Sequence, residues 1–258
     1  MSDVDVIVLD IDGGAMLRAC LDSIFAQTLP PRRVIVYDNG SRVPTRDDRA
    51  QVIRSETNLG FAGGVNAALA HATSPFVALI NNDVVLDRDW LETVVAAMND
   101  EKVAAAQTVI RREDGSIDGA GVDWSDGTIR QAAAGEAAHH HIGYAVSATA
   151  AIYRRELVHF DERFFAYYED VELAARLLEQ GWHMRVIDEI KATHRGSQSA
   201  GVLGKRGLYL RTRNRYFVAR LHRGTGRIGA LLWEDLKLLA RGRSSLRGMI
   251  AGLCSRLS

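Results

Sequence analysis

The stretch FVALINNDVVLD, residues 76–87, decides how the rest of the chain is understood. Five apolar residues end abruptly in Asn81, Asn82 and Asp83, and apolar residues then resume. A strand buried on both faces of an α/β sheet has such an apolar run, and ligands bind beyond the carboxyl ends of these strands. Amide and carboxylate oxygens suit Mg²⁺ or Mn²⁺, which usually take one or two carboxylates together with substrate phosphates. The triplet is therefore a candidate metal and phosphate site, although Asn and Asp are also common turn formers.

The composition is that of an ordinary globular protein with one large domain, or one domain and an appendage. The 258 residues are 47% hydrophobic and 25% charged, and the formal net charge is zero, so we expect no nucleic-acid partner. Cys20 and Cys254 lie near opposite ends, which favours a reducing compartment over a disulfide framework or a zinc site. No secretory signal is apparent, and no run approaches the ~20 apolar residues that span a bilayer. These features favour a cytoplasmic protein.

The first forty residues alternate strands and a helix. Apolar runs at 4–9 and 34–37 predict buried strands, and apolar residues at helical spacing predict a helix over 15–27. This order predicts a parallel sheet with a right-handed crossover. Asp38 and Asn39 follow the second strand at the expected carboxyl edge, where a carboxylate could hold a ribose or base, or could simply cap a turn.

A glycine-rich segment, NLGFAGGVN at 58–66, follows a short strand ending near 54–56 and precedes an alanine-rich helix that ends at Ala72. Glycines before a helix let a phosphate or sugar approach the backbone, and the helix N-terminus favours an anion. The segment fits neither the P-loop pattern nor the dinucleotide fingerprint, so by itself it is a weak signal. A further helix is expected over 89–98.

The middle of the chain is less regular. Residues 103–110 predict a strand, and 144–153 are expected to return to the sheet. Between them, residues 111–141 have little periodicity and indicate hairpins and loops that could cover an acceptor. The triplet His139 to His141 could suggest a metal, but three adjacent imidazoles cannot easily converge on one ion, so a solvated loop is favoured.

The second informative stretch is FDERFFAYYEDVEL, residues 160–173. Glu169 and Asp170 come immediately before a helix expected over 171–180. Acids at a helix start can be simple partners of the helix dipole. Aromatic neighbours would, however, partly desolvate these carboxylates, and desolvation raises a carboxyl pKa toward a value that suits a general base.

One histidine has a suggestive position. His194 is expected after the end of a last strand at 182–187. A lone histidine is more often structural than a ligand, but a neutral imidazole there could complete a metal site with Asp83.

From residue 205 onward the chain becomes basic. Arginines and lysines recur among leucines and aromatics, against only Glu234 and Asp235 as acids. Apolar faces lined with arginine suggest helices that lie on an anionic membrane surface. A helical cap on the core, with solvated arginines, explains the pattern equally well, and nucleic acid is a weaker alternative.

Together these stretches resemble the family 2 glycosyltransferases, in particular the bacterial branch that contains rhamnosyltransferases. The resembling segments, in order, are VIVYDNGS at 34–41, NLGFAGGVN at 58–66, LINNDVVLDRDW at 79–90, FDERFFAYYEDVEL at 160–173 and HRGSQS at 194–199, and residues 213–215 look like the tail of that branch. Five motifs in order, across about 200 residues, are far more specific than any one of them.

The resemblance implies an α/β glycosyltransferase A fold: a Rossmann-like mixed sheet with a C-terminal helical extension. Residues 1–200 would form the catalytic domain, with a nucleotide-binding half at 1–100 and an acceptor half at 101–200. Residues 201–258 would be the basic amphipathic helical tail. The family also implies inversion at the anomeric carbon by direct displacement.

Roles follow motif by motif. Asn82-Asp83 takes the place of the Asp-x-Asp metal motif, so Asp83, with His194 near it, would hold Mn²⁺ or Mg²⁺ at the donor diphosphate. Asp170 would be the catalytic base, with Glu169 beside it. The motif positions expected at the nucleotide sugar are Asp38, Asn39, Asn58, Gly60, Phe61, Gly63, Asn66, Asn81 and Asn82. A divalent ion would neutralise charge on the leaving diphosphate, and the base would take the acceptor hydroxyl's proton.

Two positions depart from the family pattern. Residues 9–12, LDID, stand where the branch usually has an Asn-Tyr-Asn-like end to the first strand, which puts the usual nucleotide contacts there in doubt. Asparagine at 81 and 82 leaves Asp83 as the sole carboxylate of the metal motif.

We therefore expect a metal-dependent inverting transferase that moves a sugar, rhamnose from dTDP-rhamnose being one candidate, onto a bacterial cell-surface glycan or its lipid-linked precursor. The alternatives are a UDP-hexose or galactofuranose donor, and a non-catalytic nucleotide-sugar-binding or scaffold protein. A scaffold would not need Asp83, Glu169, Asp170 and His194 together. The basic tail suggests peripheral contact with the inner face of the cytoplasmic membrane through residues 205–258.

Overall fold

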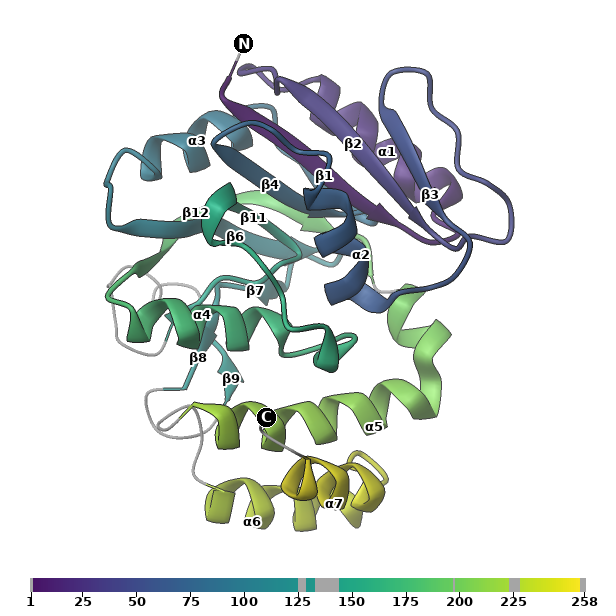
Figure 1. The fold of residues 1–258 in the computed structure, drawn as a ribbon, viewed down its shortest axis with the longest axis vertical. Coiled ribbons are helices and arrows are strands. Elements are labelled where there is room, and N and C mark those ends of the chain that lie inside the picture. Colours follow the sequence, from purple (N-terminus) through teal and green to yellow (C-terminus); the bar gives the residue numbers. More distant parts are fainter. Residues whose placement is uncertain (1, 125–128, 133–143, 197, 223–227, 256–258) are drawn as a thin grey trace.

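The computed structural model describes residues 2–124, 129–132, 144–196, 198–222 and 228–255. Within these residues a mixed sheet of nine strands forms the centre of the molecule, and three further strands form a small second sheet (Figure 1). The order of the large sheet is β3-β2-β1-β4-β11-β6-β12-β5, and β7 pairs with β6. Its strands are β1 Val4–Asp10, β2 Arg33–Asn39, β3 Gln51–Ser55, β4 Phe76–Asn81, β5 Val84–Leu86, β6 Val103–Arg112, β7 Ile117–Gly119, β11 Ala150–Arg154 and β12 His183–His194.

The first half of the sheet is parallel, as the sequence predicts. Strand β1 pairs in parallel with both β2 and β4, and β2 pairs in parallel with β3. Helix α1, Gly14–Phe25, connects β1 to β2, and helix α2, Gly60–Leu69, connects β3 to β4. The carboxyl ends of β1, β2 and β4 therefore meet at one edge, where Asp10, Asn39 and Asn81 are the last strand residues.

The central strands are largely apolar because both faces of the sheet are covered. On β1, Ile7 belongs to the core that includes Val65 of α2, whereas its neighbours Val6 and Val8 belong to the core that includes Leu21 of α1. Helix α4, Glu169–Glu179, packs in the first of these cores, and α3, Trp90–Ala97, packs in the second. Successive strand residues point to opposite faces, so a strand buried on both cannot alternate with polar residues.

The second half of the sheet mixes directions. Strand β11 is antiparallel to β4 and β6, while β12 runs parallel to β6 and antiparallel to β5. The strand predicted at 182–187 is in fact longer and ends at His194, which lies opposite Val84 of β5. The charged residues Asp188, Glu189 and Lys191 interrupt the apolar pattern, because this part of the strand is largely exposed and its register shifts.

The glycine-rich segment is not a loop before a helix, as the sequence suggested, because α2 already begins at Gly60. Gly63 and Gly64 are buried within the helix. A Cβ at Gly64 would lie 2.6 Å from the Leu9 side chain, so glycine here lets the helix pack closely on the sheet.

The return to the sheet expected at 144–153 is divided between the two sheets. Only β11 joins the large sheet, and β10, Tyr144–Ala145, pairs with β8, Val122–Asp123, in the small one, which β9, Arg130–Gln131, completes. The triplet His139 to His141 lies outside the described residues. Two short 3-10 helices, Arg155–Leu157 and Glu162–Phe164, precede α4.

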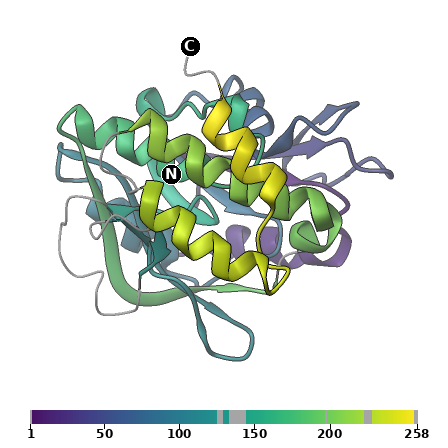
Figure 2. The same cartoon turned by 90° about the horizontal axis from the view of Figure 1, so that it is seen from below.

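Three C-terminal helices cover one end of the molecule (Figure 2). They are α5 Gln198–Leu221, α6 Ile228–Leu239 and α7 Leu246–Cys254. Phe217 and Val218 of α5 are part of the main core, so this helix is a cap on the α4 side of the sheet. Helices α6 and α7 pack on the outer side of α5 through Tyr216, Leu231 and Met249. Among the described helices, none has the combination of length and apolarity that crossing a bilayer requires.

Candidate active site

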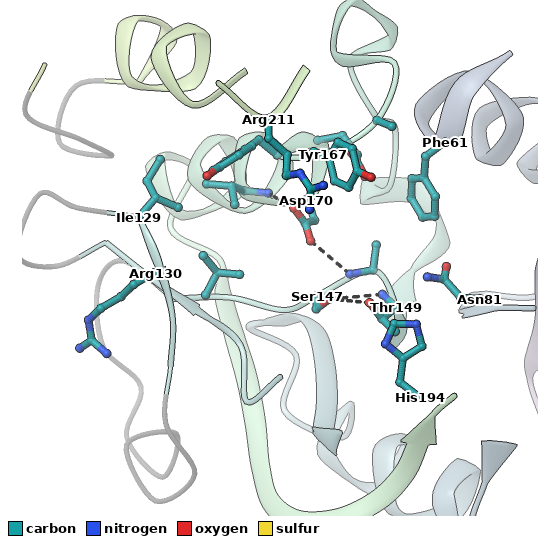
Figure 3. Close-up of a pocket in the computed structure, with 16 residues that line it drawn as sticks. Phe61, Asn81, Ile129, Arg130, Ser147, Thr149, Tyr167, Asp170, His194 and Arg211 are labelled. Atoms are coloured by element: carbon teal, nitrogen blue, oxygen red, sulfur yellow. Dashed lines mark hydrogen bonds between the residues drawn. The ribbon is translucent and has the colours of Figure 1, made fainter. Parts of the chain in front are cut away.

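A cavity of about 430 Å³ lies where the end of β4, the end of β12, the start of α4 and helix α5 converge (Figure 3). Asp170 at the start of α4 and His194 at the end of β12 face it from opposite sides, and residues 147–149 lie between them. Other polar or aromatic residues of its lining are Phe61, Asn81, Arg130, Ser147, Thr149, Tyr167, Tyr168, Glu169 and Arg211. The cavity therefore brings together residues that the sequence places more than a hundred positions apart.

Hydrogen bonds with residues 147–149 and with the end of β1 fix the Asn-Asn-Asp turn at the end of β4. The backbone N–H of Asn81 donates to the Thr149 carbonyl at 2.9 Å, and Asn81 lines the cavity. The Asn82 amide donates to an oxygen of Asp10 at 2.6 Å, and the Thr45 hydroxyl donates to the other oxygen at 2.5 Å. Asp10, one of the positions that departs from the family pattern, therefore ties the end of β1 to this turn.

His194 lines the cavity, whereas Asp83 and Asp118 lie behind it and contact its ring. His194 Nε2 lies 3.1 Å from an Asp83 oxygen, and its Nδ1 lies 2.7 Å from an oxygen of Asp118 on β7. Burial lowers the pKa of His194, but the carboxylates of Asp118 and Asp83 raise it more, to about 9. Asp118, which also pairs with Arg112 at 2.6 Å, holds the imidazole toward Asp83.

Asp83 has the free oxygen that a cation would need. The residue is 3% exposed, and its Oδ1 is buried without a hydrogen-bond partner among the described residues. Such an orphaned carboxylate oxygen is costly unless it meets a ligand. Within the described part of the chain, no three His, Cys, Asp or Glu side chains are grouped to hold a metal. The donor set fits an ion held mainly by phosphate oxygens and water, with few ligands from the protein.

The two carboxylates on the other side of the cavity have raised pKa values. Burial raises the pKa of Glu169, and the neighbouring Asp170 raises it further. Burial also raises the pKa of Asp170, although N–H donors from Ala148, at 3.4 Å, and Val171, at 2.8 Å, oppose the shift. The direction agrees with what the aromatic surroundings predict. A buried carboxyl group with a raised pKa can accept a proton near neutral pH.

The turn that carries these carboxylates has a strained backbone. Phe165, Tyr167 and Tyr168 have φ angles of 63°, 71° and 68°, a region that residues other than glycine rarely adopt. Asn214 of α5 is fully buried beneath the turn and donates its amide N–H groups to the carbonyls of Phe164, Ala166 and Tyr167, at 2.9, 2.8 and 2.7 Å. The tail therefore holds the strained turn in place.

Helix α2 holds the same turn from the other side. The backbone N–H of Phe61 donates to the Phe165 carbonyl at 2.6 Å. Gly60 has φ +78°, and a Cβ there would lie 2.4 Å from that carbonyl oxygen, so only glycine fits. The glycine-rich motif thus contacts the turn that leads to Glu169 and Asp170, as well as the sheet.

Several predicted nucleotide contacts are hydrogen-bonded within the protein. Asp38 is fully buried and accepts from the Ser41 and Thr45 N–H groups, at 2.8 and 3.0 Å, and from Arg54. Burial raises the pKa of Asp38, but these donors outweigh it and lower the pKa below its usual value. This carboxylate therefore shapes the turn after β2, and its contact with a nucleotide stays a prediction.

The predicted asparagines at the edge of the sheet form a framework. Asn39 donates to the Gly60 carbonyl at 2.9 Å and accepts from the Leu59 N–H at 2.9 Å. Asn58 accepts from the Gly60 N–H at 2.8 Å. The Asn66 side chain donates to the Phe160 carbonyl and accepts from the Phe160 N–H. Of the predicted nucleotide-sugar residues, Phe61 and Asn81 line the cavity. Roles in donor binding stay predictions for the whole set.

The sequence did not single out Asp118, the segment 147–149 or Arg211. Asp118 lies in a region without periodicity, and 147–149 has the small residues of an ordinary loop. Arg211 is one of many arginines in the tail, where regular basic spacing masks an individual role. A motif search could have found Asn214, because it lies in the tail segment that resembles the family.

Comparison with solved structures identifies the fold. Mannosyltransferase PcManGT from Pyrobaculum calidifontis, in complex with GDP-Man and Mn²⁺, superposes with a TM-score of 0.64 over 96% of this chain and 77% of that one, at 20% identity. The architecture is thus the glycosyltransferase A fold, as the sequence predicts.

Sequence comparison gives the family. Residues 6–160 match Glycosyl transferase family 2, and the chain belongs to this family. The pre-mycofactocin glycosyltransferase of Mycobacterium tuberculosis is 30% identical over 71% of this chain and 40% of its own length. The N-acetylglucosaminyl-diphospho-decaprenol L-rhamnosyltransferase of the same organism is 26% identical over 96% of this chain and 92% of its own length. The chain spans less than half the length of several of its curated relatives.

Proposed function

We propose that the protein is an inverting, metal-dependent glycosyltransferase that moves a sugar from a nucleotide-diphospho-sugar to an acceptor hydroxyl. One observation carries the proposal: Asp170 and the Asp83-linked His194 face each other across a single cavity of about 430 Å³. Inverting displacement needs a base on one face of the sugar and charge stabilisation on the other. This arrangement offers both.

In the proposed reaction Asp170 takes the proton of the acceptor hydroxyl while that oxygen attacks the anomeric carbon. The bond from the anomeric carbon to the diphosphate oxygen breaks, and its electron pair leaves with the nucleoside diphosphate. Attack opposite the leaving group inverts the configuration. The raised pKa of Asp170 makes it a stronger base than an exposed aspartate.

The donor diphosphate would lie at the Asp83 side of the cavity. Asp83, through its unpartnered Oδ1, and His194 are the residues that would hold Mn²⁺ or Mg²⁺ there. When bound, the ion would neutralise the charge that develops on the leaving diphosphate. Asp118 would keep the His194 ring in position through its bond to Nδ1.

For the substrates we propose a deoxyhexose donor such as dTDP-rhamnose and an acceptor sugar that a diphosphate joins to a polyprenol. The supporting observation is that the mycobacterial relative matching nearly the whole chain is named for L-rhamnosyl transfer to such an acceptor. A UDP-hexose or galactofuranose donor would use the same carboxylates.

We also propose that the protein binds peripherally to the inner face of an anionic membrane. Four of its most exposed large apolar side chains lie on α6 and α7: Trp233, Leu236, Leu246 and Ile250. Lys237, Arg241 and Arg247 lie on or beside the same helices. An apolar surface bordered by cations suits the boundary of an anionic bilayer.

The central test is Asp170→Asn, which keeps the shape of the side chain and removes its basicity. We expect turnover to fall by about 10³-fold, whereas donor binding measured calorimetrically with Mn²⁺ should change little. Glu156→Gln, an acid-to-amide change at an exposed position, is the matched control. Wild-type turnover in Asp170→Asn would refute the assignment of Asp170 as the base.

A further inference from the structure

A second cavity, of about 440 Å³, lies between α5, α6 and the turn that connects α6 to α7. Three arginines line it: Arg211 and Arg215 from α5, and Arg243 from the turn. The remaining lining residues are Tyr168, Leu208, Thr212, Asp235, Leu238 and Gly242. Its walls therefore combine cationic groups with two leucines.

The cavity has a surplus of positive charge. Asp235 is its only carboxylate and is buried, with one oxygen accepting from Arg215 and, at 2.8 Å, from the Ser244 hydroxyl. Arg215 and Asp235 thus neutralise each other. Arg211 and Arg243 are exposed and form no ion pair with a carboxylate among the described residues. Two guanidinium groups remain to donate hydrogen bonds to an anion.

This second cavity adjoins the catalytic one. Tyr168 and Arg211 line both. The Arg211 guanidinium lies over the Tyr167 ring, 4.7 Å from its centroid, and Figure 3 shows it beside Asp170 at the edge of the catalytic cavity. A ligand that presents a hydroxyl to Asp170 can therefore extend past Arg211 toward Arg243.

We propose that the cavity between α5 and α6 binds the diphosphate of the acceptor, with Arg211 and Arg243 as its hydrogen-bond donors. The inference rests on the proposed function, because it requires that an acceptor sugar lie at Asp170. It goes further by assigning the acceptor's anionic group to a separate site from the donor diphosphate at Asp83. A lipid chain attached to this diphosphate would leave toward the exposed apolar residues of α6 and α7.

Binding of farnesyl diphosphate to the full chain tests the proposal without turnover. Binding is measured by fluorescence or calorimetric titration in the presence of EDTA, which removes divalent ions and so prevents metal-dependent binding at the donor site. We expect Arg243→Ala to weaken binding about tenfold, the size of a lost charge-assisted hydrogen bond, and Arg243→Lys to restore part of the loss. Arg18→Ala is the matched control, because Arg18 is an exposed arginine on α1, outside the cavity lining. Its affinity should stay within twofold of wild type.

Two further measurements separate the competing explanations. Flotation with phosphatidylglycerol vesicles should be the same for wild type and Arg243→Ala. Loss of flotation in Arg243→Ala with unchanged farnesyl diphosphate affinity would mean that the cavity takes a headgroup phosphate, and would overturn the proposal. Equal affinity of wild type and Arg243→Ala for farnesyl diphosphate, or equally tight binding of uncharged farnesol, would overturn it as well. Asp170→Asn should bind farnesyl diphosphate normally, so a failure of the proposed transferase reaction would be seen separately.

Discussion

Asn214 is distant in sequence from Asp170, the proposed base, but it fixes the conformation of the turn that leads to this residue. Its amide serves three carbonyls of a turn in which three residues have positive φ, and the turn leads directly into Glu169 and Asp170. A turn of this kind persists only where its surroundings fix it. We therefore regard Asn214 as a positioning residue.

Asn214→Ala should leave these carbonyls without a donor, loosen the turn and admit water around Asp170. We expect kcat to fall by about 10²-fold with a small change in the donor KM, and the free energy of unfolding to fall by roughly 2–3 kcal/mol. Burial raises the pKa of Asp170, so hydration should lower that pKa and shift the acid limb of the kcat–pH profile to lower pH. Kinetics across pH and denaturant unfolding measure these effects.

Gln27→Ala is the control for this prediction. Gln27 is another buried amide, bonded to the carbonyls of Ser23 and Asp87 and to the Leu91 N–H on the α1 side of the sheet. The Gln27→Ala variant should lose a similar amount of unfolding free energy, but the acid limb of its kcat–pH profile should not shift. An unshifted limb in Asn214→Ala would reduce Asn214 to a purely structural role.

At the scale of elements, one histidine joins α4 to α5. His222 near the end of α5 lies 3.3 Å from Glu172 and 3.0 Å from Glu179, both on α4. Burial lowers the pKa of His222, but the two carboxylates outweigh it and raise the pKa above its usual value. Helix α4, which carries Glu169 and Asp170, is therefore held to α5 partly by a titratable contact.

A folded-state pKa above the unfolded value means that the contact stabilises the protein fully below the unfolded pKa, about 6.5. The contribution is lost as pH rises through the folded value. His222→Gln should accordingly lower the free energy of unfolding by about 1–2 kcal/mol at pH 6 and by much less at pH 9. Urea unfolding at the two pH values measures the difference. His71→Gln, at an exposed site, should change neither value, and an equal loss in His222→Gln at both pH values would contradict the prediction.

At the scale of the whole molecule, four of the eight exposed large apolar side chains in the described residues lie at one end. Trp233 and Leu236 of α6 are 64% and 58% exposed, and Leu246 and Ile250 of α7 are similar. These residues lie on the helices farthest from the sheet, as Figures 1 and 2 show. The neutral net charge of the chain conceals a basic segment from residue 205 onward and an acidic remainder.

The full chain carrying Trp233→Ser and Leu236→Ser should float with phosphatidylglycerol vesicles at least tenfold less than wild type, because each buried large side chain contributes about 1.5–3 kcal/mol. The loss should leave the unfolding midpoint unchanged, since both residues are exposed. Val43→Ser is the control: Val43 is 77% exposed but lies between β2 and β3, outside α6 and α7. Equal flotation of the double variant and wild type would exclude this surface as the membrane contact.

The sequence by itself determined the features that depend on neighbouring residues. Continuous apolar runs specified the buried strands, because a strand covered on both faces has no polar side. The abrupt change at Asn81 marked the end of β4, and acids after an aromatic cluster marked the start of α4. Ordered motifs then specified the family. Local patterns did not predict structure where side chains are exposed, because an exposed strand need not be apolar. The second half of β12, which contains exposed charged residues, is the example.

Only the tertiary structure decided which side chains meet. His194 bonds Asp118, 76 positions away, and Asn214 bonds the turn 47 to 50 positions before it. Arg211 belongs to a tail whose sequence resembles membrane-binding helices, yet the fold places it in the lining of the cavity beside Asp170. The physical reason is that a hydrogen bond forms between whichever groups the folded core brings within about 3 Å of each other. Helical or strand periodicity carries no information about which residues, distant in sequence, will meet in this way.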